Sequence, residues 1–299
     1  MSLAYRYANA GTFLKMLESQ TLWFSDLRRM NDWDEYAAGF RIASEIVTKE
    51  FQDHGHVLAE ISPERMSSAF MVLICSFSMD RDCLSMWRGY GDNGAGAAIG
   101  YDYQEIATSH LSARYLTKMA PIQGKAQFFP VIYQEGDFRG QVRAYLQKAV
   151  RLPSKEVQLG VMKVALMRLC TLYKNDFFVD ERELRGFIEV NETADPYVLG
   201  ARESGFGEAS YHQVNTSCFG VPTIKEVVLG PLCKLSLEEV QAKLVECDLP
   251  RVKVHQSRGT YREAPAVSTP PPTARGGQFN PGVIQRQVAP ATAVQPPMF

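Results

Sequence analysis

Residues 70–78 read FMVLICSFS, an apolar run that ends in alternating serine and phenylalanine. Its β-branched and aromatic residues are typical of a strand that is buried in a sheet. A strand core normally excludes polar groups, because their burial costs free energy unless they are hydrogen-bonded or serve a site. Ser76 and Ser78 therefore indicate that this strand carries part of a functional site.

Two further polar clusters lie in or beside strand-like runs, Tyr5-Arg6-Tyr7 and Glu181-Arg182-Glu183. A charge moved into a low-dielectric interior loses several kcal/mol unless it is paired or in use. An arginine, two alternating serines and two alternating glutamates suit a cleft that grips a phosphate-bearing cofactor and stabilises a developing sugar cation. The three clusters together predict such a cleft.

Strand and helix patterns alternate along the rest of the chain. Apolar runs predict strands over residues 3–8, 21–24, 95–101, 128–133, 184–190, 224–229 and 252–255. Helical spacing predicts helices over residues 35–51 and 154–174, and a capping box of Ser236 and Glu239 marks another helix start. Strands dispersed among helices predict an α+β fold, with a mixed, mainly antiparallel sheet core and helical cover.

The composition is that of a globular protein whose net charge produces no strong electrostatic field. The 299 residues include 45% hydrophobic and 11% aromatic residues, which is ample for a packed core, and the formal net charge is -1. Six cysteines are too sparse for a disulfide scaffold and indicate a reducing, cytoplasmic setting. The longest apolar run, 69–75, is far shorter than the roughly 20 residues that span a bilayer, so no membrane association is expected.

The composition changes sharply near Glu263, after which proline recurs among Ala, Thr, Gln and Gly. Such a segment buries too little surface to offset the entropy of ordering it. The sequence therefore predicts one globular domain over residues 1–263 and a disordered, proline-rich tail over 264–299. The tail is interpreted as a solvated linker, with a partner-binding or export segment as the alternative.

Several weaker motifs have a plain structural role as an alternative to a functional one. Residues 89–94 match the glycine pattern of dinucleotide-binding loops, but a helical turn precedes them and a strand follows, so a tight turn or a bulged strand entry is predicted. His54 and His56 lack further ligands at suitable spacing, and no metal site is predicted. Asn31, in a polar loop, and Trp87, whose ring could stack on nicotinamide or adenine, remain cofactor-binding candidates, with loop turns and core packing as the alternatives.

The order of these motifs resembles a bacterial family of domains of unknown function, DUF2971. The resemblance rests on the clusters at 5–7, 76–78 and 181–185, on the segment 84–90, and on Val228-Leu229-Gly230-Pro231. It extends over about residues 3 to 263. The family name implies no activity.

A looser resemblance does imply one, because the order of arginine, serines and glutamates is similar to the signature of ADP-ribosyltransferases. This resemblance implies an ADP-ribosyltransferase-like fold in which Arg6 holds the phosphates and ribose of NAD, while Ser76 and Ser78 brace the nicotinamide side. Glu183 would be the catalytic glutamate that stabilises the transition state as nicotinamide leaves, and Glu181 would orient the acceptor. In the alternative interpretation, Glu183 pairs with Arg185 in a structural salt bridge.

The leading hypothesis is an NAD-dependent ADP-ribosyltransferase that modifies a macromolecule, either protein or nucleic acid, as bacterial toxins and defence effectors do. Tyr7, Trp87 and Asn31 complete the predicted cofactor-binding set. An immunity or chaperone protein is a further expected partner, and the expected location is the cytoplasm, with delivery into a target cell as a variant. A non-enzymatic binding module and an NAD or nucleotide glycohydrolase are the alternatives.

Overall fold

The computed structural model describes residues 2–30, 33–63, 65, 70–107, 122–191, 199–204, 207–217 and 222–260. By its internal contacts the chain divides into a unit Met1–Arg262 and a unit Glu263–Phe299. The predicted tail, 264–299, lies outside the described residues, as do Asn31 and Asp32. The sheet and the helices belong to the first unit.

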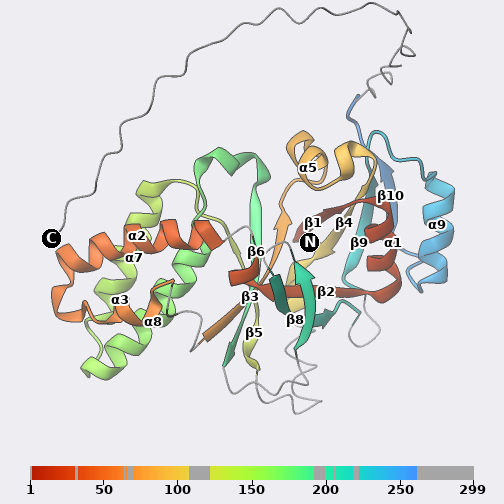
Figure 1. The fold of residues 1–299 in the computed structure, drawn as a ribbon. Coiled ribbons are helices and arrows are strands. Elements are labelled where there is room, and N and C mark those ends of the chain that lie inside the picture. The colour runs from red at the N-terminus through yellow and green to blue at the C-terminus, as the bar shows by residue number, and fades with distance from the viewer. Residues whose placement is uncertain are drawn as a thin grey trace, which may run out of the picture. The chain divides into compact units, whose positions relative to one another are not determined.

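Ten strands of the described residues form one sheet (Figure 1). They are β1 (Leu3–Ala8), β2 (Thr21–Asp26), β3 (Phe70–Ser78), β4 (Ala97–Asp102), β5 (Ile122–Pro130), β6 (Glu183–Asn191), β7 (Gly200–Ser204), β8 (Gly207–Asn215), β9 (Ile224–Leu229) and β10 (Lys253–Gln256). The order is β10-β9-β4-β1-β3-β2-β8-β7, and β6 pairs with both β3 and β5. The pair β9–β10 is parallel and the other described pairs are antiparallel, which confirms a mixed, mainly antiparallel α+β fold.

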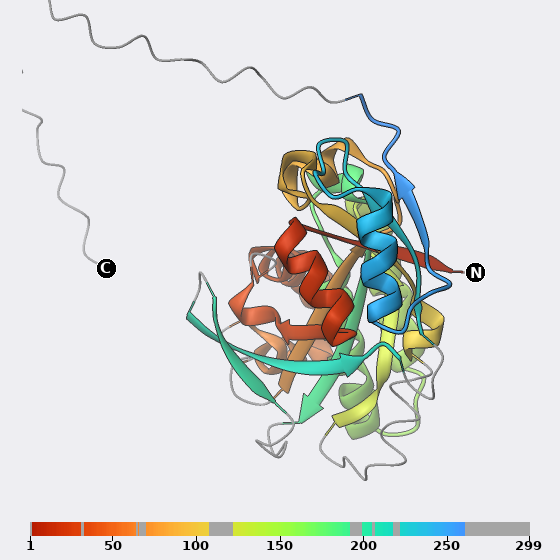
Figure 2. The same ribbon diagram turned by 90° about the vertical axis from the view of Figure 1, so that its right-hand side faces the viewer.

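Helices cover the sheet in two groups. The described α-helices are α1 (Ala10–Ser19), α2 (Trp33–Glu50), α3 (Val57–Ile61), α5 (Leu84–Gly89), α7 (Glu135–Ala149), α8 (Lys155–Leu172) and α9 (Leu237–Glu246). In Figure 1, α2, α3, α7 and α8 gather at one end of this unit, and α1 and α9 lie at the other. The view of Figure 2 shows α1 beside α9, where Lys243 and Glu18 form an ion pair of 2.7 Å.

Alternation along β3 sorts its side chains between two hydrophobic cores. Leu73, Cys75 and Phe77 pack into the core that also receives Phe13 of α1. Val72 and Ile74 face the other way, into the core built with α2, α7 and α8. Both faces of this strand are therefore covered, which explains why its sequence is a continuous apolar run rather than an alternating one.

The predicted strands over 3–8, 70–78 and 224–229 are confirmed with the same bounds, and the capping box at Ser236 is confirmed in both of its hydrogen bonds. The tight turn at 89–94 is confirmed, because α5 ends there and β4 follows. The sequence analysis missed β7, β8 and α7. For α7 a signal existed, since Phe138, Val142, Leu146 and Ala149 are buried at helical spacing.

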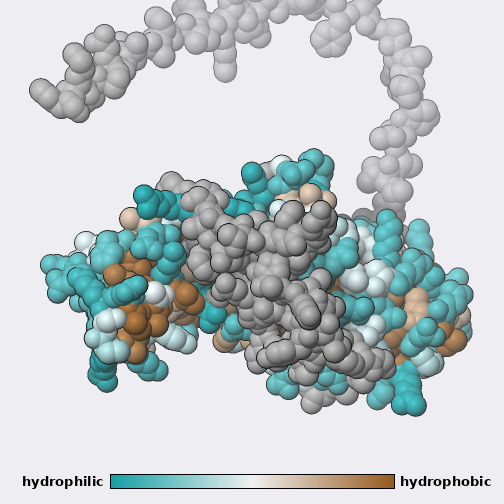
Figure 3. All heavy atoms as spheres, turned by 90° about the horizontal axis from the view of Figure 1, so that it is seen from below, coloured by the Kyte–Doolittle hydropathy of each residue, from teal (hydrophilic) through white to brown (hydrophobic). Residues whose placement is uncertain are grey.

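The surface of this unit carries exposed apolar side chains. Viewed from below, hydrophobic residues gather over the helical end and over the end that holds α9 (Figure 3). Val157 and Val161 of α8 and Val245 of α9 are among the exposed ones. None of the helices in the described residues is both long enough and apolar enough to cross a membrane.

Candidate active site

The site lies where two strands diverge from one edge of β3. Along its other edge, β3 pairs with β6 over its full length. On the site's edge, β3 pairs with β2 at Leu73 and Ile74 and with β1 at Ser78. Among the described residues, 75–77 have no strand partner there. A cavity of about 930 Å³ opens beside this unpaired stretch, a volume typical of pockets that hold small ligands.

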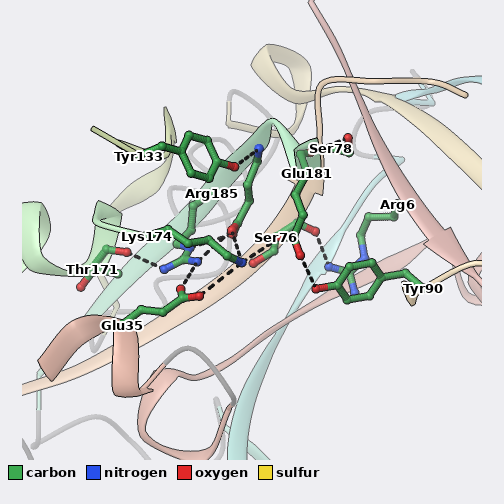
Figure 4. Close-up of polar contacts among 11 residues, drawn as sticks. Arg6, Glu35, Ser76, Ser78, Tyr90, Tyr133, Thr171, Lys174, Glu181 and Arg185 are labelled. Carbon is green, nitrogen blue, oxygen red and sulfur yellow. Dashed lines mark hydrogen bonds and ion pairs between the residues drawn. The ribbon is translucent and has the colours of Figure 1, made fainter. Parts of the chain in front are cut away.

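Six of the predicted site residues line this cavity: Arg6, Tyr7, Ser76, Ser78, Glu181 and Glu183. They come from β1, β3, the 3-10 helix η4 (Asp176–Glu181) and β6, so segments far apart in sequence meet here (Figure 4). The antiparallel register pairs Ser78 with Glu183 and Ser76 with Arg185, which puts these four side chains on one face of the sheet.

Arg6 occupies the gap left by the diverging strands. Its Nη1 donates to the carbonyl oxygen of Ser76 at 2.7 Å and to Sγ of Cys75 at 3.3 Å. The guanidinium also lies 5.8 Å from the centre of the Phe77 ring. Arg6 thus satisfies a carbonyl that a neighbouring strand would otherwise bind, and it brings a positive charge into the cleft.

Glu183 is buried in a network of ion pairs. Its carboxylate accepts hydrogen bonds from Nε and Nη2 of Arg185, at 2.8 and 2.9 Å, and from Nζ of Lys174 at 3.2 Å. Burial alone would raise the pKa of Glu183, but the positive charges and hydrogen bonds of Arg185 and Lys174 outweigh it and lower the pKa to about 2. Glu183 is therefore ionised and paired with Arg185, as the structural alternative anticipated.

Glu181 is the more accessible of the two glutamates. Its side chain is 16% exposed, against 4% for Glu183. One carboxylate oxygen accepts a 2.7 Å hydrogen bond from Lys174, and the other accepts a 3.1 Å bond from the hydroxyl of Tyr90. The contacts hold the Glu181 carboxylate at the wall of the cleft (Figure 4).

Lys174 joins the carboxylates of this site. Besides Glu181 and Glu183, its Nζ lies 3.4 Å from Glu35, which also pairs with Arg185 at 3.3 Å. Three carboxylates, Glu35, Glu181 and Glu183, therefore lie around Lys174, and Arg185 pairs with two of them. The sequence analysis missed Lys174, although a lysine directly after the apolar residues of α8 was a usable signal.

The two serines have different roles. The Ser78 hydroxyl donates to the carbonyl oxygen of Glu181 at 2.7 Å and accepts from the amide of Asp80 at 3.1 Å, so it holds the turn that leads into β6. Oγ of Ser76 is buried in the wall of the cavity and makes no hydrogen bond of suitable distance and angle. Of these two hydroxyls, that of Ser76 is the one without a hydrogen-bond partner.

Two further candidates for cofactor binding, Tyr7 and Trp87, have their polar side-chain atoms engaged by other residues. Tyr7 lines the cavity, but its hydroxyl is engaged by the carbonyl oxygen of Asp80 and the amide of Cys83, at 2.8 and 3.2 Å. Trp87 is 3% exposed, donates to Asp82 at 2.7 Å and packs edge-on against Tyr7. It is core packing, the alternative interpretation, and does not line this cavity; Tyr90 of the same segment does.

A family model described as Protein of unknown function (DUF2971) matches residues 86–186. The resemblance to that family is confirmed over about a third of the chain, a shorter range than 3–263. The matched segment contains Lys174, Glu181 and Glu183, but neither Arg6 nor Ser76. No curated protein and no solved structure matches the chain.

Proposed function

We propose that this protein is an ADP-ribosyltransferase-like enzyme that binds NAD as a substrate in the cleft beside β3. The observation that carries the proposal is the convergence of Arg6, Ser76, Glu181 and Glu183 on one cavity of about 930 Å³. Each of these residue types is common, so their meeting from four separate segments supports the proposal more than their presence in the sequence does.

The cleft offers the groups that a dinucleotide requires. Arg6, Lys15 and Arg202 line it and bring positive charge to the place where the diphosphate would bind. The hydroxyl of Ser76, which has no hydrogen-bond partner in the protein, supplies a hydrogen-bonding group near the carboxylates. Phosphates would bind on the side of Arg6, and the nicotinamide ribose on the side of Glu181.

In the proposed reaction, the bond between the ribose and nicotinamide breaks, and nicotinamide leaves with the bonding electron pair. The anomeric carbon of the ribose gains positive charge, which the Glu181 carboxylate stabilises. A nucleophile of a protein or nucleic-acid acceptor then bonds to that carbon and gives up its proton to water. We assign the direct contact to Glu181, and a positioning role to Glu183, because Arg185 and Lys174 already bind the Glu183 carboxylate.

Arg185 and Lys174 already bind the Glu183 carboxylate, so this group is not free to act on a substrate. This observation favours a second candidate function, a non-enzymatic module that binds a nucleotide in the same cleft. Release of nicotinamide from NAD separates the two. We expect the wild-type protein to release nicotinamide and Glu181→Gln to lose at least about 100-fold in rate, in line with the loss of one group that stabilises transition-state charge. Glu156→Gln, at an exposed position on α8, is the matched control.

The assay also offers protein and single-stranded nucleic acid as acceptors. If the protein binds NAD but releases no nicotinamide with any of them, the result favours the binding module. Equal rates for wild type and Glu181→Gln would remove Glu181 from the reaction. A water acceptor would make the enzyme an NAD glycohydrolase, and this is recognised by free ADP-ribose as the product.

A further inference from the structure

A pair of stacked aromatic rings lies beside the cleft. Trp23 of β2 and Tyr211 of β8 have ring centroids 4.3 Å apart and an interplanar angle of 16°. Trp23 is 44% exposed and lines the cavity, although its neighbours Leu22 and Phe24 are buried in the core. A large aromatic surface is thus turned toward the space in which a ligand would bind.

The backbone of β7 accommodates this stack. Gly200 pairs with Tyr211 across the sheet, and a Cβ at position 200 would lie 2.4 Å from Cζ of the tyrosine. The Tyr211 ring therefore occupies the place that any other residue at position 200 would fill with its side chain. This packing fixes the ring against which Trp23 stacks.

An unsatisfied donor lies on the same face of the sheet. Arg202 of β7 lines the cavity, and its Nη2 donates to Oγ of Ser25 at 3.2 Å. Its Nε is buried and has no hydrogen-bond partner. A buried donor is unfavourable when it is left unpaired, so Arg202 Nε is suited to an acceptor atom that a ligand brings.

We propose that the Trp23–Tyr211 stack is a nucleobase-binding subsite, in which a base stacks on Trp23 and Arg202 donates to the same nucleotide. Flat aromatic surface beside guanidinium donors matches a base that is attached to a charged phosphate. The proposal rests on the cleft being a nucleotide site, but it does not rest on the transfer of ADP-ribose. The base has two sources, the adenine of NAD or a nucleotide of the acceptor.

Titration calorimetry of the full chain tests the subsite without any turnover. The probes are AMP, NAD, nicotinamide mononucleotide, which lacks adenine, and a single-stranded oligonucleotide. Trp23→Ala should weaken binding of the probe that uses the subsite by between about 5-fold and 100-fold, the range for one base stacked on an aromatic side chain. Trp23→Phe should retain most of the affinity, and Tyr145→Ala, at an exposed aromatic on α7, should retain all of it.

The probes also identify the source of the base. Weaker binding of AMP and NAD, with nicotinamide mononucleotide unchanged, assigns the subsite to the adenine of NAD. Weaker binding of the oligonucleotide, with NAD unchanged, assigns it to the acceptor. If Trp23→Ala does not fold, Arg202→Met keeps the stack and should weaken the same probe.

Unchanged affinity for all four probes in the foldable variants, or no binding of any of them by the wild type, would overturn the subsite. The nicotinamide assay is a separate readout. Base binding that depends on Trp23, without any nicotinamide release, would leave the subsite standing and remove the proposed transfer reaction.

Discussion

Lys174 donates a 2.7 Å hydrogen bond from Nζ to Oε2 of Glu181, and this contact links the buried ion pairs to the wall of the cleft. The same amine reaches Glu183 at 3.2 Å and Glu35 at 3.4 Å. A lysine with a 5% exposed side chain thus sets the position of both glutamates that the sequence singled out. The site depends on this residue as much as on its carboxylates.

Replacing Lys174 by methionine should therefore destabilise the protein strongly. It removes the cation that pairs with Glu35, Glu181 and Glu183, and breaking a buried pair by removing one partner costs about 3–5 kcal/mol. Urea unfolding would measure the free energy of unfolding. Lys163→Met is the control, because Lys163 pairs with Glu60 at 3.1 Å on the surface and should lose less than about 1 kcal/mol. Similar losses in the two variants would contradict the central place of Lys174.

The lowered pKa of Glu183 predicts acid sensitivity. The carboxylate has an ordinary pKa of 4.5 and a pKa of about 2 in the folded protein, so it binds a proton more readily when the chain is unfolded. Its contribution to stability is present above pH 4.5 and is lost as the pH falls toward 2; it is on the order of 3 kcal/mol.

Unfolding free energies of wild type and Glu183→Gln at pH 6 and pH 3 check this sign. The wild type should lose more stability than the variant between the two pH values. A difference between the two proteins that is the same at both pH values would show that Glu183 is not the titrating group.

The two serines should respond in opposite ways. Ser78→Ala removes two hydrogen bonds of a buried hydroxyl and should cost about 1–3 kcal/mol of stability, seen as a lower urea midpoint. Ser76→Ala removes a hydroxyl without a hydrogen-bond partner, so its stability should change by less than about 0.5 kcal/mol while its affinity for NAD falls. The reverse pattern would exclude Ser76 as a ligand group.

Arg6→Lys tests whether the cleft needs a guanidinium or only a charge. A lysine keeps the positive charge but lacks the planar set of donors that holds both the Ser76 carbonyl oxygen and a phosphate. We expect about tenfold weaker binding of NAD by titration calorimetry. Arg143→Lys, on the helical surface where Arg143 pairs with Glu50, should bind as the wild type does. Equal affinity of Arg6→Lys and wild type would place the phosphates elsewhere.

The sequence predicted the central strand β3 and the residues that meet at its edge, because buried polar groups in apolar runs are a local signal. It could not show which glutamate is open to the cleft, since that depends on Arg185 and Lys174, which reach Glu183 only through the tertiary fold. The place of Trp87 was ambiguous for a similar reason, because its neighbours do not reveal which face of α5 is buried. The strands β7 and β8 were missed, and with them the stack of Trp23 on Tyr211.

A crystal structure with an NAD analogue whose nicotinamide ribose is carbocyclic, and so cannot be cleaved, would locate the substrate. We expect the diphosphate at Arg6 and the ribose hydroxyls within hydrogen-bond reach of Glu181, about 3 Å. An analogue bound at another surface, or one whose nicotinamide ribose points away from Glu181, would contradict the assignment of this cleft as the site of ADP-ribose transfer.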